Sequence, residues 1–61
     1  MRTFSVNTMD GSAFTTEAEN IEDIFGKIDG LRLMGKRWIK LYNPVFLVDV
    51  YVNIDQIVSI F

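Results

Sequence analysis

Residues 36–42, with the sequence KRWIKLY, are the part of this chain best suited to recognition chemistry. Ile39 and Leu41 alternate with larger aromatic and basic residues, which is the pattern of a strand that buries one face. The residues on the opposite face of such a strand are Trp38, Lys40 and Tyr42. We expect this face to contact a partner, and two classes of partner are compatible with it.

The first alternative is a larger protein, which this chain would inhibit or modulate without catalysing a reaction. Trp, Tyr and Arg are enriched among the residues that dominate binding energy at protein interfaces. The predicted contacts are Arg37, Trp38, Lys40, Tyr42 and Tyr51.

The second alternative is a nucleic-acid-binding regulator, in which bases stack on Trp38 and Tyr42 while Lys40 approaches the phosphates. The formal net charge of −2 does not provide the broad basic surface that nucleic-acid binding usually needs. A protein partner is therefore favoured over a nucleic acid. A purely structural interpretation also exists, in which the two aromatic rings pack at the edge of the core and Lys40 reaches water.

Catalytic and metal-binding patterns are missing from the chain. It has no histidine and no cysteine, so the usual base of a catalytic triad and the usual ligands of structural zinc are lacking. Its aspartates, such as Asp10, Asp29, Asp49 and Asp55, lie at predicted turns or on solvated faces, where aspartate more often forms caps than catalytic pairs. We expect no enzymatic activity, no cofactor and no metal site.

The first half of the chain predicts a hairpin followed by a helix. Phe4, Val6 and Thr8 would share the inner face of the first strand, and Asp10 with Gly11 predicts a tight turn into a short returning strand over 12–15.

Thr16 and Glu19 have the spacing of a capping box, which predicts that a helix begins there and ends near Asp29 and Gly30. Apolar residues recur at offsets of three and four through this segment, as in an amphipathic helix on a sheet. They are Ala18, Ile21, Ile24, Phe25 and Ile28.

The second half predicts strands only. Residues 31–34 and 37–42 are strand-like on either side of Gly35 and Lys36, which favours a second hairpin. After the break at Pro44, a long strand over 45–54 is expected, with its even positions in the core. Those positions are Phe46, Val48, Val50, Val52 and Ile54. A turn over 53–56 and a last strand over 57–61 complete the prediction.

These elements predict a single α+β domain over residues 1–61, a small twisted antiparallel β-sheet of about five to six short strands packed with one amphipathic helix. A chain of 61 residues without disulfides has little core to stabilise it, and 49% of its residues are hydrophobic. We therefore expect a homo-oligomer, a dimer or larger, and a well-packed chain terminus. The residues predicted to contribute to self-association are Leu47, Tyr51, Ile57, Ile60 and Phe61.

The expected location is the cytoplasm, because the N-terminal residues lack the apolar core of a signal peptide and polar residues interrupt the C-terminal apolar run. Residues 51–60 resemble a strand–turn–strand phrase of short bacterial β-rich domains, which implies local structure and no particular activity. In size and composition the chain is similar to accessory proteins of phages and mobile elements, some of which block a host defence enzyme. That similarity implies an inhibitor acting in a bacterial host cytoplasm.

Overall fold

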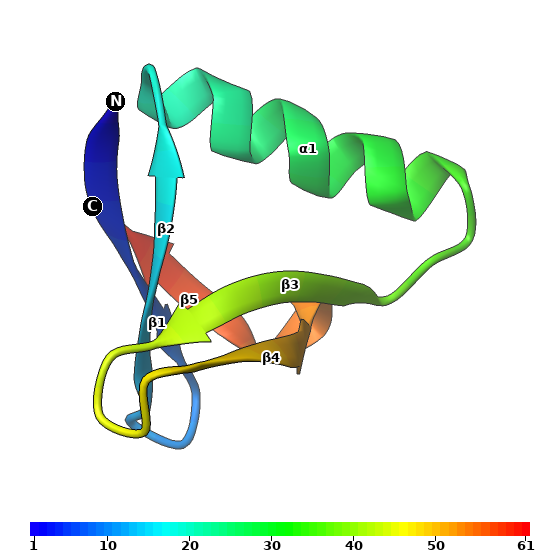
Figure 1. The fold of residues 1–61 in the computed structure, drawn as a ribbon. Helices are drawn as coiled ribbons and strands as arrows, with labels where there is room; N and C mark the ends of the chain where they lie inside the picture. The colour runs from blue at the N-terminus through cyan, green and yellow to red at the C-terminus, as the bar shows by residue number, and fades with distance from the viewer.

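The computed structural model describes residues 1–61 and shows an antiparallel sheet packed with one helix (Figure 1). The predicted α+β class is confirmed, with five strands. The elements are β1 (Arg2–Thr8), β2 (Ala13–Ala18), α1 (Ile21–Leu33), β3 (Trp38–Asn43), β4 (Val48–Asn53), the 3-10 turn η1 (Ile54–Gln56) and β5 (Ile57–Ile60).

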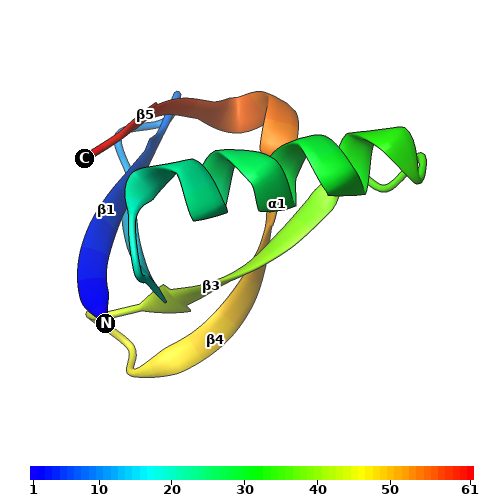
Figure 2. The ribbon, with the colours of Figure 1, turned by 90° about the horizontal axis from the view of Figure 1, so that it is seen from above.

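The strands are ordered β4-β3-β2-β1-β5 in a single sheet. Two hairpins, β1–β2 and β3–β4, are joined through α1, and β5 returns to pair with β1 on the side opposite β2. The sheet is strongly curved, so that the β3–β4 hairpin crosses the β1–β2 hairpin and α1 lies over the concave side (Figures 1 and 2). β4 and β5 are consequently the two edges of the sheet.

The core is small, because only 10 of the 61 residues are buried. Its apolar members come from all layers of the fold and are Phe4, Val6, Ala18, Ile24, Ile28, Ile39, Leu41, Val52 and Ile54. The predicted inward positions of β1 are correct, since Phe4, Val6 and Thr8 are all buried. Many large apolar side chains are left outside this core.

The β1–β2 turn is one residue longer than the tight turn predicted from Asp10 and Gly11. The Thr8 backbone N–H donates to the Ser12 carbonyl across the hairpin at 3.0 Å. This bond leaves three residues in the loop. Gly11 has a φ of 86°, the left-handed conformation that this loop type requires at its last position. The Asp10 carboxylate accepts from the Thr8 hydroxyl at 2.5 Å and from the Ser12 amide at 3.0 Å.

The predicted start of the helix was wrong, because β2 continues through the proposed capping box. Thr16 pairs with Phe4 in the β1–β2 ladder, and the helix begins only at Ile21. Asn20 is the actual cap, and its Oδ1 accepts the backbone N–H of Asp23 at 3.1 Å. Pairing along a whole strand outweighed the local cap signal.

The predicted end of the helix and the strand over 31–34 were also wrong. α1 continues through Gly30 to Leu33 and closes with two backbone bonds, from Lys36 to the Leu31 carbonyl at 2.9 Å and from Gly35 to the Arg32 carbonyl at 3.0 Å. Gly35 has a φ of 73°. This is the Schellman ending, in which glycine stops a helix without steric strain. Gly35 and Lys36 therefore end a helix and form no hairpin.

The long strand predicted over 45–54 is shorter, since β4 begins at Val48. Val52 and Ile54 are buried and Val50 is half-buried, as expected for the inner face. Phe46 and Val48 are 74% and 48% exposed, so their assignment to the core was wrong. The chain turns over residues 44–47, which carries Phe46 away from the core.

Candidate functional site

The outer face of the β3–β4 hairpin brings together the residues that the sequence singled out. Along β3, buried Ile39 and Leu41 alternate with the exposed residues Trp38, Lys40 and Tyr42, as predicted. In the ladder with β4, Lys40 lies opposite Tyr51 and Tyr42 lies opposite Asp49, and residues directly opposite share a face. We call Trp38, Lys40, Tyr42, Asp49 and Tyr51 the aromatic face.

Two of these aromatic side chains are more exposed than a core role allows. Trp38 is 56% exposed and Tyr51 70%, whereas Tyr42 at 38% is close to half-buried. Ile39 and Leu41, on the reverse side of the same strand, are each only 2% exposed. The rings therefore stand on a strand whose back is anchored in the core.

The charges around the aromatic face are unevenly distributed. Lys40 and Asp49 form an ion pair of 3.6 Å between Nζ and Oδ2, and both side chains are more than half exposed. Lys36 and Arg37, just before β3, make no ion pair. The end of the aromatic face beside Lys36 and Arg37 is thus positively charged. In its middle, the charges of Lys40 and Asp49 offset each other.

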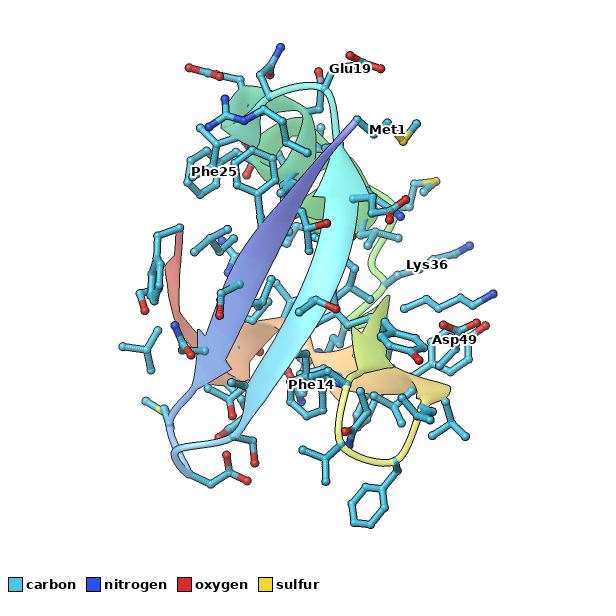
Figure 3. The ribbon with its side chains drawn as sticks, turned by 60° about the vertical axis from the view of Figure 1, so that its left-hand side comes forward. Met1, Phe14, Glu19, Phe25, Lys36 and Asp49 are labelled. Carbon is cyan, nitrogen blue, oxygen red and sulfur yellow. The ribbon has the colours of Figure 1, made fainter.

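Two shallow hollows flank the aromatic face. One, of about 440 Å³, lies among residues 35–38 and Tyr51, so it combines free cations with two rings. The other, of about 450 Å³, lies among Lys40, Tyr42, Asp49 and residues 15–17 of β2, where it is more polar. Lys36 and Asp49 point out on the same side of the molecule, and Phe25 lies toward the other side (Figure 3).

The β3–β4 turn carries a second apolar surface, of which the sequence analysis singled out only Leu47. Val45, Phe46 and Leu47 are 79%, 74% and 69% exposed, and we call them the apolar tip. The Asn43 side chain accepts the amides of Val45 at 2.9 Å and Phe46 at 3.2 Å, and Leu47 bonds the Asn43 carbonyl at 2.8 Å. These three bonds close the turn that carries the tip. The sequence feature that could have indicated this turn is Asn43 followed by Pro44, because an asparagine side chain often accepts hydrogen bonds from the amides that follow it in a turn.

Leu47 has a φ of 58°, in the left-handed region that glycine or asparagine normally fills. An ordinary side chain there is destabilising by roughly 1 kcal/mol or more. It is the only residue other than glycine in the chain with a positive φ.

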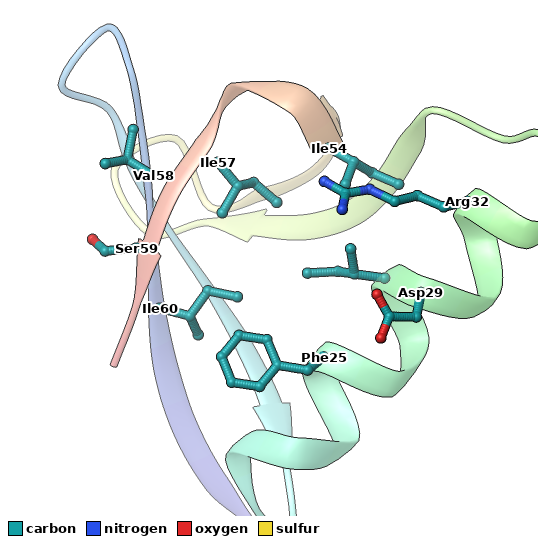
Figure 4. A pocket seen from close by; sticks show the side chains of 9 residues that line it. Phe25, Asp29, Arg32, Ile54, Ile57, Val58, Ser59 and Ile60 are labelled. Atoms are coloured by element: carbon teal, nitrogen blue, oxygen red, sulfur yellow. The ribbon is translucent and has the colours of Figure 1, made fainter.

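A groove between α1 and β5 is a further feature absent from the sequence prediction. It has a volume of about 420 Å³, and Phe25, Ile57 and Ile60 point toward one another across it while Val58 and Ser59 point away (Figure 4). Asp29 and Arg32 of α1 stand at its margin. Arg32 approaches Asp55 to 4.0 Å, so the charges at this margin are also compensated.

The residues predicted to contribute to self-association lie at two separate places. Leu47 and Tyr51 are on the β3–β4 hairpin, and Ile57, Ile60 and Phe61 follow one another at the other edge of the sheet. Phe61 is held by a reciprocal pair of backbone bonds to Ser5, at 2.7 and 2.9 Å, although its side chain is 71% exposed. The terminus is thus fixed through its backbone, and its ring is not covered by the fold.

Three of the carboxylates take part in separate local interactions. Hydrogen bonds from the Thr8 hydroxyl, and then from Ser12, hold the pKa of the exposed Asp10 carboxyl below its usual value. Asp49 and Asp55 each pair with a different cation. No group of three or more acidic, histidine or cysteine side chains is close enough to hold a metal ion. α1 is not long and apolar enough to cross a membrane.

No protein-family model matches the chain, and no curated protein or solved structure matches it.

Proposed function

We propose that this chain is a non-catalytic interaction protein that binds a larger protein through the aromatic face and inhibits or modulates it. The observation that carries the proposal is the exposure of Trp38 and Tyr51 on neighbouring strands whose inner faces form the core. An aromatic side chain has few rotatable bonds, so a ring on a strand that is anchored in the core loses little entropy on binding, which favours affinity.

The composition of the aromatic face agrees with this proposal. A binding centre typically combines Trp, Tyr and Arg, and truncating such a residue costs about 2 kcal/mol or more of binding energy. Trp38 and Tyr51 would be the anchors. Arg37 and Lys36 supply uncompensated positive charge beside them, which suits an acidic margin on the partner.

A nucleic-acid partner remains the alternative proposal, favoured by the same two cations beside two exposed rings. The Lys40–Asp49 pair counts against it, because a phosphate approaching Lys40 would also approach a carboxylate. Glu17 adds a second negative charge along the same strip. The basic surface is thus confined to one end of the face.

The rest of the proposal follows the expected accessory role. The chain would act in the cytoplasm as a homo-oligomer, and its target would be a larger enzyme or defence complex, as for phage accessory proteins. Neither a nucleophile with a base nor a metal cluster is needed for such a role, since occupying the surface of the target is sufficient.

Affinity capture with matched variants tests the proposal. Wild-type bait is expected to retain a stoichiometric protein from host lysate, and Trp38→Ala and Tyr51→Ala baits are expected to lose it. Val58→Ala is the control, because Val58 is 64% exposed on β5, outside the aromatic face. Retention of the same protein by all three variants would contradict the proposal.

Oligonucleotide binding separates the two partner classes. If single-stranded oligonucleotides bind at low salt, weaken steeply as salt is added and fail to bind Trp38→Ala, the nucleic-acid alternative replaces the first proposal. No binding at low salt would leave the protein partner as the only proposal.

A further inference from the structure

The two edges of the sheet differ in how well they are protected against pairing with another strand. β5 has four residues and is interrupted by a bulge opposite Asn7 and Thr8, and a bulge is one of the usual devices that blunt an edge. β4 has six residues with the sequence VDVYVN and pairs with β3 without a register shift. It contains no proline and no lysine, and nothing lies beyond it in the sheet (Figure 2).

The backbone groups that β4 leaves unpaired follow from the register. Ile54 donates its N–H to the Arg37 carbonyl at 2.8 Å, so that pair of opposite residues is of the hydrogen-bonded kind. Hydrogen-bonded and non-hydrogen-bonded pairs alternate along an antiparallel ladder. The even-numbered residues of β4 therefore bond β3, and the N–H and C=O groups directed away from β3 belong to Asp49, Tyr51 and Asn53.

We propose that β4 pairs antiparallel with β4 of a second copy of this chain across a two-fold axis, with Tyr51 opposite Tyr51 of the second copy. Asp49 of each copy then lies opposite Asn53 of the other. All three outward-facing residues are used, and each hydrogen-bonded pair contributes two backbone bonds. The two sheets become one continuous sheet.

Charge and strand length together favour this register over its neighbours. Moving one copy by four residues in one direction places Asp49 opposite Asp49, and like charges directly opposite are destabilising. Moving it by two residues in the other direction places Asp49 opposite Asp55, which has the same charge and lies in η1, outside the strand. Moving one copy by only two residues in the first direction sets Asp49 opposite Tyr51 and Asn53 opposite Leu47. Leu47 lies outside the strand with a φ of 58°, so that register forms fewer bonds.

The inner and outer faces both fit the pairing with Tyr51 at the axis. On the inner face, half-buried Val50 meets Val52, which extends the apolar layer without a gap. On the outer face, the two Tyr51 rings become neighbours. Valine and tyrosine are also residues that favour strands.

In the same register the apolar tip of each copy also lies against the second copy. Val48, the first residue of β4, lies opposite Ile54 of the second copy, where η1 begins, and the apolar tip directly precedes Val48. The tip of each copy is therefore carried alongside η1 of the other. A stable interface buries about 800 Å² per partner, which one short strand pair does not supply, so the tip has to contribute. A second copy is thus the occupant that accounts for both the edge and the tip.

This inference rests on the self-association included in the proposed function, and it adds the surface and the register. Sedimentation at micromolar protein tests it first. We expect the wild type to have twice the 7.0 kDa mass of the chain. Tyr51→Lys should halve that mass, because two lysines would face each other at the axis. Val58→Lys, an equal change of charge on β5, should leave the mass doubled.

Cysteine cross-linking tests the register, and the chain has no cysteine of its own to interfere. Opposite residues in a hydrogen-bonded pair have Cα atoms about 5.5 Å apart, within reach of a disulfide. Tyr51→Cys should therefore oxidise to a covalent dimer. Asp49→Cys alone should not, but a mixture of Asp49→Cys with Asn53→Cys should cross-link. Val58→Cys is the control that should remain uncross-linked. Because Asn53 also caps η1, that variant is used only if its circular dichroism matches the wild type.

Three results would overturn the inference: a wild-type mass of 7.0 kDa at every micromolar concentration, cross-linking of Val58→Cys but not Tyr51→Cys, or a dimer that Tyr51→Lys leaves intact. These results are distinguishable from failure of the proposed function. A monomer that still captures its target through Trp38 contradicts the dimer alone. A dimer with Tyr51 at its axis that captures nothing contradicts target binding alone.

Discussion

Single residues determine the shape of both hairpin turns. Asp10 accepts two hydrogen bonds in the β1–β2 turn, and Asn43 accepts two in the β3–β4 turn. Aspartate and asparagine are suited to this role because a short side chain reaches the amides that follow it. The two turns differ at their left-handed position, which is Gly11 in the first and Leu47 in the second. Only the second turn is therefore strained.

Asp10 should give folding stability a dependence on acid pH. Its pKa is lowered in the folded chain, first by the Thr8 hydroxyl and then by Ser12, so its ionised form is favoured by folding. The resulting stability is fully present above the unfolded value of about 3.9 and is lost as pH falls through the lower folded pKa. Thermal melts of Asp10→Asn across this range should show a smaller decrease than the wild type. Identical pH profiles for the two proteins would contradict this role of Asp10.

Leu47→Gly should stabilise the monomer by about 1 kcal/mol, because glycine adopts a positive φ without steric cost. Urea unfolding is the measurement, in the Tyr51→Lys background so that contacts of the proposed dimer do not contribute. Val45→Gly is the matched control, since Val45 is equally part of the exposed tip and has no positive φ. It should be neutral or destabilising. A loss of stability in Leu47→Gly would show that the tip is not strained.

The elements were predictable where the local pattern decides and unpredictable where partners distant in sequence decide. The faces of β3 follow from simple alternation, and its buried and exposed residues were predicted correctly. The start of α1 was not, because Thr16 and Glu19 form a good cap locally and only the pairing of β2 with β1 overrides it. The start of β4 was predicted too early, because Phe46 and Val48 continue the apolar alternation of the strand although residues 44–47 form a turn.

Gly30, inside α1, offers a test of the corrected helix boundary. A Cβ at Gly30 meets no atom within 4 Å, and the residue lies in a helix that continues to Leu33. Gly30→Ala should therefore stabilise the protein by up to about 1 kcal/mol. If the helix ended at Gly30, as the sequence suggested, no gain would be seen.

Gly35→Ala is the control for that experiment. Its φ of 73° closes the helix, so alanine there should destabilise by about 1 kcal/mol in the same urea measurement. Equal effects of alanine at positions 30 and 35 would contradict the Schellman ending.

At the scale of the whole molecule, a small core coexists with many exposed apolar side chains. Fourteen large hydrophobic side chains, among them Trp38, Phe46 and Tyr51, are exposed. Scattered exposure is ordinary, but here exposed residues gather on the aromatic face and the adjoining apolar tip. The sequence indicated the first surface through residues 36–42. The sequence indicated the second surface only through Leu47, because Phe46 resembles a core residue until the turn is placed.

The small core makes the fold sensitive to a single cavity. A 61-residue domain has about 3 to 9 kcal/mol of stability, and Leu41→Ala at a site 2% exposed should remove about 2 to 5 kcal/mol. Circular dichroism should show this variant partly or wholly unfolded. Leu33→Ala, at a site 89% exposed, should change stability by no more than about 0.5 kcal/mol. A stable Leu41→Ala would contradict the assigned core.

The most direct test of the aromatic face uses Trp38, the one tryptophan of the chain. A single fluorotryptophan incorporated at this position gives one ¹⁹F resonance, and an unlabelled partner adds no signal. Titration with the protein recovered by affinity capture should shift and broaden this resonance until the two proteins are equimolar. An unchanged resonance, at concentrations where the complex demonstrably forms, would contradict the assignment of the aromatic face as the binding surface.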